Sequence, residues 1–181
     1  MLTGKAIKLD TIDPDDIEWM RQRRNDPELR QYFREWKDVS KDKQERWYKS
    51  RGNNSDPSHV YFKILGITDK EENLIGCCGL HYIDWRLRNA EFGIYVSQEY
   101  RGQGRGAEAI FMLFDYGFRE MNLHKIWCEV YDNNKAINVY KKIGFKEEGV
   151  LRDSYFCNGK YGNSTVMSIL EDEWFEGNGG R

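Results

Sequence analysis

The order of its elements predicts that this chain folds as a mixed α/β domain, a central sheet with helices on both faces. Three observations support this class. Strand-like segments follow one another over residues 60–97, a βαβα segment includes a glycine-rich turn near residue 102, and a long hairpin begins at residue 145. The 181 residues suffice for a single domain, which we place at residues 1–176, with a flexible polar tail over residues 177–181.

The N-terminal third is predicted to contain one strand and two helices. A short strand is expected over residues 5–9. Residues 13–16, DPDD, are typical of a helix start, because carboxylates interact favourably with the positive end of the helix dipole. This helix is expected to end near Asn25, before a proline, and a second helix is expected over residues 41–51, before a loop rich in Gly, Asn and Ser.

Hydrophobic periodicity predicts the remaining elements. Ile110, Leu113, Phe114 and Gly117 recur at helical spacing, which indicates a long helix with a core-facing stripe. In chain order we expect strands over residues 60–67, 74–82 and 90–97, the long helix over 104–121, a strand over 125–131, a helix over 133–143 and a hairpin with arms 145–157 and 163–170.

Composition excludes several classes of protein. The chain has 28 Lys and Arg against 30 Asp and Glu, so it lacks the basic excess typical of nucleic-acid-binding proteins. No apolar run approaches the roughly 20 residues of a membrane-spanning helix, and the first ten residues lack the apolar segment of a signal peptide. The four cysteines and three histidines lack metal-ligand spacing. We therefore expect a cytoplasmic protein with no metal, no nucleic-acid partner and no membrane partner.

A glycine-rich segment between a predicted strand and the long helix is the strongest functional signal. Glycines let the backbone approach a ligand closely, and a helix N-terminus presents unpaired N–H groups at its positive end. This combination predicts phosphate binding, and a tight turn without a ligand is the alternative. The segment comprises Arg101, Gly102, Gln103, Gly104, Arg105, Gly106 and Ala107.

Two phosphate-binding patterns fit this segment. Gly102, Gly104 and Ala107 satisfy the dinucleotide pattern G-x-G-x-x-G/A, but the first glycine does not directly follow the strand and only one further strand–helix unit follows. Arg101, Gly104 and Gly106 satisfy the pattern R-x-x-G-x-G/A. In this form the segment resembles the pyrophosphate loop of the GCN5-related N-acetyltransferases, the GNAT family.

A second motif strengthens the resemblance. Residues 133–145, NNKAINVYKKIGF, match the family pattern N-x-x-A-I-x-x-Y-x-K-x-G-F, and they follow the first motif after a helix and a strand. The resemblance covers residues 60–170. It implies the GNAT fold, with a mostly antiparallel sheet and a splayed parallel strand pair, and transfer of an acetyl group from acetyl-CoA to a primary amine of a small acceptor.

The resemblance also implies where acetyl-CoA binds. The cofactor is expected between the strands 90–97 and 125–131, where splaying leaves backbone groups of Ile94, Tyr95 and Val96 unpaired, and the extended pantetheine arm can satisfy them. The N–H group of Val96 is a candidate to polarise the thioester carbonyl.

Further cofactor contacts come from the two motifs. The N–H groups of residues 102–107 are expected to hold the pyrophosphate, and Asn133 is expected to hydrogen-bond the cofactor arm. Asn138, Tyr140 and Lys142 complete the set of cofactor-binding residues that the second motif implies.

Two side chains have catalytic roles by the same resemblance. Tyr140 occupies the position of the family's general acid, where a phenol gives a proton to the departing thiolate, and aromatic packing on the sheet is the alternative. Glu91 is expected to deprotonate the amine directly or through water, although it could instead be a solvated or ion-paired strand residue, with solvent as the base.

The acceptor is predicted from charge and from two further resemblances. Residues 18–51 hold eleven Lys and Arg against seven Asp and Glu, and this excess argues against a polyamine and for an anionic acceptor. Residues 23–30, RRNDPELR, resemble the opening of members that acetylate nucleotide-linked amino sugars. The closing hairpin, which begins FKEEG at Phe145, resembles one shared by amino-sugar, spermidine and ribosomal-protein N-terminal acetyltransferases.

These observations predict an amino-sugar acceptor. Acetylation of a polyamine or of a protein N-terminus, and a non-catalytic acyl-CoA-binding module, are the alternatives. A homodimer is also left open by the sequence.

Overall fold

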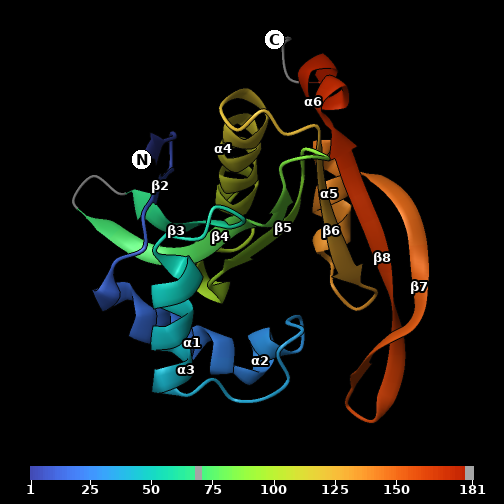
Figure 1. The fold of residues 1–181 in the computed structure, drawn as a ribbon. Helices are drawn as coiled ribbons and strands as arrows, with labels where there is room; N and C mark the ends of the chain where they lie inside the picture. Colours follow the sequence, from blue (N-terminus) through green and yellow to red (C-terminus); the bar gives the residue numbers. More distant parts are fainter. Residues whose placement is uncertain (68–70, 178–181) are drawn as a thin grey trace.

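One continuous sheet forms the centre of the structure, a computed structural model that describes residues 1–67 and 71–177 (Figure 1). Over those residues eight strands pair in the order β1-β2-β3-β4-β5-β6-β8-β7, and every neighbouring pair is antiparallel except β5 and β6. This confirms the predicted mixed, mostly antiparallel sheet. The strands are β1 Leu2–Thr3, β2 Ile7–Asp10, β3 Val60–Ile67, β4 Glu72–Asp84, β5 Asn89–Val96, β6 Lys125–Tyr131, β7 Lys146–Cys157 and β8 Lys160–Leu170.

Helices cover both faces of this sheet (Figure 1). The N-terminal helices lie on one face, α4 and α5 lie on the other, and α6 follows β8. None of the helices in the described part of the chain has the length and apolar character needed to cross a membrane. The helices are α1 Ile17–Asn25, α2 Pro27–Arg30, α3 Lys41–Trp47, α4 Arg105–Arg119, α5 Ala136–Ile143 and α6 Glu171–Gly177, and a π-helical turn, Tyr48–Gly52, extends α3.

Alternation along the strands divides the side chains of the sheet between two hydrophobic layers. On β5, Phe92 points toward α4 and packs edge-on against Phe114 at 5.0 Å between ring centroids. Tyr95 points to the opposite face and stacks on Trp19 of α1 at 6.2 Å. Burial of each such apolar side chain stabilises the fold by about 1.5–3 kcal/mol.

Some elements differ from the sequence prediction. The helix expected from residue 133 begins at Ala136, because the side chain of Asn134 accepts a hydrogen bond from the Ala136 N–H at 3.0 Å and holds the preceding residues in a turn. The short elements β1, α2 and α6 were not predicted. Gly177, expected in the flexible tail, is the last residue of α6, and the rest of that tail lies outside the described residues.

The parallel strands β5 and β6 separate after three paired positions. Asn89, Ala90 and Glu91 pair with residues 125–127, and the register ends there. Each strand continues its antiparallel ladder on its other side, β5 with β4 up to Val96 and β6 with β8. The predicted splayed pair is therefore present, and Figure 1 shows the two halves of the sheet diverging from it.

Candidate active site

The glycine-rich loop before α4 presents a backbone surface to open space. Gly102 and Gly104 have φ values of +73° and +79°, a left-handed conformation that favours glycine. A Cβ atom added to either residue would meet no atom within 4 Å. The first intrahelical bond runs from the Glu108 N–H to the Gly104 carbonyl at 3.0 Å, so the three preceding amides of the first turn have no intrahelical acceptor. These features fit a bound pyrophosphate.

Side chains of the same loop fold back onto the chain. Arg101 Nε donates to the Val96 carbonyl at 2.8 Å, and Gln103 Nε2 donates to the Glu99 carbonyl at 3.2 Å. The guanidinium of Arg105 lies over the Tyr100 ring, 5.2 Å from its centroid. The arginines thereby stiffen the loop and add positive charge close to the free amides.

The gap between β5 and β6 receives backbone groups from alternate residues of β5. The Ser97 N–H donates to the Ile75 carbonyl at 2.8 Å, so the backbone groups of Ser97 and, by alternation, of Tyr95 face β4. The backbone groups of Ile94 and Val96 face the gap, although the Val96 carbonyl is taken by Arg101. Of the three residues expected to bind pantetheine, Tyr95 therefore differs, since its backbone pairs within the sheet.

Tyr140 lies on α5 with its ring in the apolar layer. The ring packs edge-on against Phe92 at 5.6 Å and tilted against Phe145 at 5.7 Å. Burial raises the pKa of Tyr140 above its ordinary value, and the nearby Cys128 thiol of β6 adds to this effect. The phenol is therefore protonated at neutral pH and lies close to a strand that lines the gap.

The other motif residues on and before α5 lie away from the Tyr140 ring. Asn133 is exposed in the turn after β6. Asn138 and Lys142 are exposed and four residues apart, so they share one face of α5, which is about 200° around the helix from Tyr140. The structure thus separates the buried Tyr140 side chain from the two exposed side chains of the same motif.

Glu91 is the last residue of β5 that pairs with β6, and the gap between these two strands opens there. Its carboxylate accepts a hydrogen bond from Arg34 Nη1 at 3.1 Å and forms an ion pair with Arg34 Nη2 at 2.7 Å. The same guanidinium contacts Glu129 of β6 at 3.0 Å, and the other oxygen of Glu129 accepts a bond from Ser164 Oγ at 2.5 Å. Two carboxylates and one arginine thus flank the gap on the face covered by the N-terminal helices.

His81 of β4 forms the floor of this face next to Glu91. The two residues are directly opposite in the β4–β5 register, and Gly93 follows on the same face. Burial lowers the pKa of His81 from its ordinary 6.5 to about 3, and the positive charges of Arg34 and Arg51 add to the effect of the neighbouring His59. His81 is therefore neutral at physiological pH.

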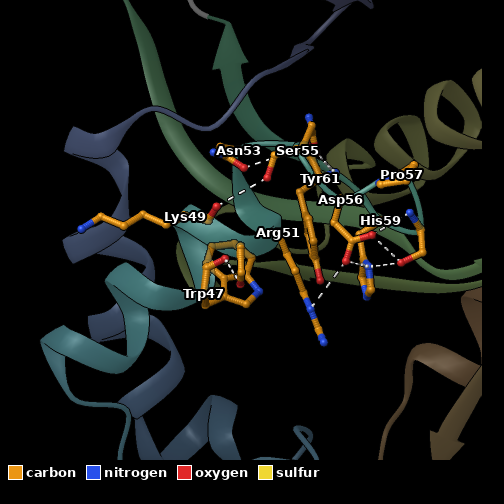
Figure 2. Close-up of polar contacts among 12 residues, drawn as sticks. Trp47, Lys49, Arg51, Asn53, Ser55, Asp56, Pro57, His59 and Tyr61 are labelled. Carbon is orange, nitrogen blue, oxygen red and sulfur yellow. Dashed lines mark hydrogen bonds and ion pairs between the residues drawn. The ribbon is translucent and has the colours of Figure 1, made fainter.

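The outer end of the same face is formed by the turn after α3 (Figure 2). His59 Nδ1 lies 3.2 Å from Asp56 Oδ2 and 2.9 Å from Ser58 Oγ. A catalytic Ser–His–Asp arrangement needs the hydroxyl and the carboxylate on opposite ring nitrogens, whereas both lie on Nδ1 here. His59 Nε2 is buried and has no hydrogen-bond partner among the described residues. This group therefore holds the turn together and lacks the geometry that activates a serine nucleophile.

Comparison with known proteins identifies the family. The acetyltransferase (GNAT) domain family matches residues 7–146, well over half of the chain. The chain belongs to the GNAT family. It is an acetyl-CoA-dependent N-acetyltransferase, which confirms the prediction made from the two motifs, and acetyl-CoA is its acetyl donor.

Spermidine acetyltransferases are among the relatives of this GNAT enzyme. Spermidine N(1)-acetyltransferase of Escherichia coli K12 is 28% identical over 189 residues, which covers 96% of the chain and 91% of that enzyme. The enzyme of the same name from Vibrio cholerae is 38% identical over 109 residues, 60% of the chain and 63% of that enzyme. A crystal structure of the V. cholerae spermidine N-acetyltransferase with CoA and spermine matches with a TM-score of 0.86 at 30% identity, covering 93% of this chain and 98% of that one.

The positive charge of the N-terminal segment is largely neutralised in this GNAT fold. Most basic residues of the segment 18–51 lie within 4.0 Å of a carboxylate, some of them from outside the segment. A charge count along the sequence therefore overestimates the positive potential offered to an acceptor. The pairs are Arg21–Glu18, Arg23–Glu99, Arg30–Asp38, Lys43–Glu35, Arg46–Asp42, Arg51–Asp56, and Arg34 with Glu91 and Glu129.

Sequence reasoning missed Arg34 and Glu129. Arg34 was only one of eleven basic residues in the segment 18–51, and Glu129 belongs to no recognised motif. The alternation of β6 places Glu129 on the same face as Trp127, the partner of Glu91, but this becomes informative only once the strand pairing is known.

Proposed function

We propose that this acetyltransferase acts on a primary amine of a polyamine of the spermidine class. The observation that most directly supports this acceptor is the pair of largely buried carboxylates, Glu91 and Glu129, at the opening between β5 and β6. A protonated amine is attracted to such a pair, which would guide it toward the thioester bound in the gap. The spermidine N-acetyltransferases of E. coli and V. cholerae among its relatives support this acceptor over the amino sugar that we predicted from charge and from the resemblance of residues 23–30.

The chain's own residues would hold the donor along one path. The free amides of the first turn of α4 and the left-handed glycines would bind the pyrophosphate, and the gap-facing groups of Ile94 and the Val96 N–H would bind the pantetheine arm. Acetyl-CoA supplies a thioester that an amine can attack. Most of the rate enhancement is expected from holding the amine and the thioester together in the right orientation.

Tyr140 is proposed as the general acid. Its buried phenol keeps its proton at neutral pH, as the raised pKa implies. A thiolate that forms in the same apolar surroundings is also poorly solvated, which raises its own proton affinity and favours transfer from the phenol oxygen.

Glu91 is proposed as the base for the incoming ammonium. It lies at the point where the strands separate, and only 12% of its side chain is exposed. A carboxylate is a far weaker base than an amine, so Glu91 would accept the proton only transiently or pass it to water as the bond to the acetyl carbon forms.

A CoA-release assay with a panel of amines tests the proposed acceptor. The panel contains spermidine, spermine, nucleotide-linked amino sugars and N-terminal peptides, all assayed with acetyl-CoA. We expect the highest kcat/KM with spermidine or spermine. Turnover confined to amino sugars would overturn the proposal and restore the acceptor predicted from the sequence, without affecting the acetyltransferase activity.

We also propose that copies of the chain associate through the β7–β8 hairpin. The outer end of the hairpin extends past the end of β6 (Figure 1), and the apolar hairpin residues Val150, Phe156 and Tyr161 are exposed. The V. cholerae spermidine N-acetyltransferase is described in a dodecameric structure. Light scattering of the protein with Phe156→Ser and Tyr161→Ser is expected to show a smaller assembly than the unmodified protein, and an unchanged mass would reject this surface.

A further inference from the structure

We infer that Arg34 is an internal counter-cation that occupies the ammonium subsite of the free enzyme and is displaced by the acceptor. This inference rests on the proposed function and concerns acceptor binding at the same site. It makes Arg34 a determinant of the affinity for cationic acceptors.

The geometry places Arg34 on the solvent side of two carboxylates. Its guanidinium contacts the Glu91 carboxylate at 2.7 and 3.1 Å and the Glu129 carboxylate at 3.0 Å. The arginine side chain is 52% exposed, whereas Glu91 and Glu129 are only 12% and 16% exposed. Carboxylates that are this far buried need a cation, because desolvation without a partner is costly. The guanidinium reaches them from outside, on the face from which an acceptor must approach.

Arg34 contacts the sheet through these carboxylates, whereas its neighbours in the chain are held by other contacts. Over residues 31–40, the other polar contacts in the described part of the chain stay within residues 18–51, here called the N-terminal arm. The side chain of Asn25 accepts a hydrogen bond from the Val39 N–H at 2.7 Å and donates one to the Val39 carbonyl at 3.0 Å. Glu35 forms an ion pair with Lys43 at 2.6 Å. The arm therefore keeps its own structure if Arg34 leaves the carboxylates, and displacement requires movement of one half-exposed side chain.

Cationic acceptors then compete with Arg34 for the carboxylates. The Nη2 atom of Arg34 alone lies 2.7 Å from Glu91 and 3.0 Å from Glu129, so one cationic nitrogen serves both carboxylates. An acceptor ammonium carries three N–H donors and can take the place of Nη2. The further ammonium groups of a polyamine add attraction to the negative charge that remains when Arg34 leaves.

Replacement of Arg34 should therefore strengthen cation binding. In the Arg34→Gln variant the acceptor no longer competes with a tethered guanidinium, so we expect the dissociation constant for spermidine to fall at least about threefold at low ionic strength. Butylamine should also bind more tightly, because its single ammonium no longer has to displace the guanidinium. Arg34→Lys, with one compact charge, should lie between the two.

Isothermal titration of spermidine into the CoA-saturated protein tests this inference. Arg46→Gln is the matched control, because Arg46 forms an exposed pair with Asp42 on α3, with side chains 73% and 72% exposed, and its removal changes the net charge equally. Unchanged CoA binding verifies that each variant is folded. Tighter spermidine binding by Arg34→Gln and not by Arg46→Gln supports the inference, and equal or weaker binding overturns it.

Turnover separates failure of this inference from failure of the proposed function. If the unmodified enzyme acetylates spermidine but Arg34→Gln binds it no more tightly, only the role of Arg34 is wrong. If the enzyme acetylates an anionic amino sugar instead, and Arg34→Gln loses that activity, both are wrong, because Arg34 then binds the acceptor.

Discussion

The imidazole of His81 occupies the space that the absent side chain of Gly93 leaves on the neighbouring strand. A Cβ atom added to Gly93 would lie 2.8 Å from His81 Nε2. A second glycine, Gly79, lies directly opposite Gly93 in the β4–β5 register, and a Cβ there would lie 2.4 Å from the Val60 carbonyl oxygen. The sheet next to Glu91 therefore depends on two glycines: Gly93 leaves room for a side chain, and Gly79 leaves room for a backbone oxygen.

Alanine substitution should distinguish these glycines. Gly93→Ala meets the end of a side chain that can rotate, and we expect a loss of about 1 kcal/mol in the free energy of unfolding. Gly79→Ala meets a backbone atom, and we expect about 2–3 kcal/mol. Urea unfolding measures both, with Gly149→Ala as the control, since a Cβ there meets no atom within 4 Å. Equal losses for Gly79 and Gly93 would contradict this account.

The low pKa of His81 predicts a dependence of stability on pH. In the folded protein His81 stays neutral down to about pH 3, whereas in the unfolded chain it takes up a proton below its ordinary pKa of 6.5. The unfolded state therefore binds more protons between these values, so stability falls as pH decreases from 6.5 toward 3, by up to about 1.4 kcal/mol per pH unit. His81→Gln should flatten this slope in urea unfolding at pH 4–6. An unaltered slope in His81→Gln would reject the assignment.

Removal of the Tyr140 hydroxyl should slow the chemical step. We expect Tyr140→Phe to lower kcat at least about tenfold with little change in acetyl-CoA affinity, because the ring still packs on Phe92 and Phe145 while the proton donor is lost. Steady-state kinetics with titration of acetyl-CoA measures both quantities. Unchanged turnover would remove Tyr140 from the mechanism and leave it as a packing residue.

A side chain at Gly104 should prevent CoA binding. Gly104→Val strains a φ of +79° and places its methyl groups in the open space where the phosphates are expected, so we expect affinity for CoA to fall at least about a hundredfold. Gly159→Val is the matched control, because Gly159 has a φ of +78° and equally open surroundings at the tip of the β7–β8 hairpin. Retained CoA binding by Gly104→Val, or an equal loss in Gly159→Val, would contradict the pyrophosphate assignment.

The conformation of the glycine-rich loop was predictable because its requirements are local. Seven consecutive residues specify left-handed turns, a helix start and two flanking arginines, and these properties depend only on neighbours in the chain. The strands β3 and β6 were predicted with their observed bounds for a similar reason, since apolar alternation and adjacent turns are visible in a short window.

The cluster of Arg34, Glu91 and Glu129 was less predictable because it is assembled from distant segments. Arg34 is 57 positions from Glu91 and 95 positions from Glu129, and the β5–β6 pairing brings the two carboxylates together. Net charge along residues 18–51 favoured an anionic acceptor, whereas the spatial pairing of those charges removes most of that argument.

The sequence by itself determined the mixed α/β class, most of the main elements and the conformation of the glycine-rich loop, because backbone preference and hydrophobic period act over a few residues. Only the tertiary structure decided which charges face each other and which are free to meet an acceptor. Electrostatic interaction depends on distance in space and on burial, and neither is a property of sequence position.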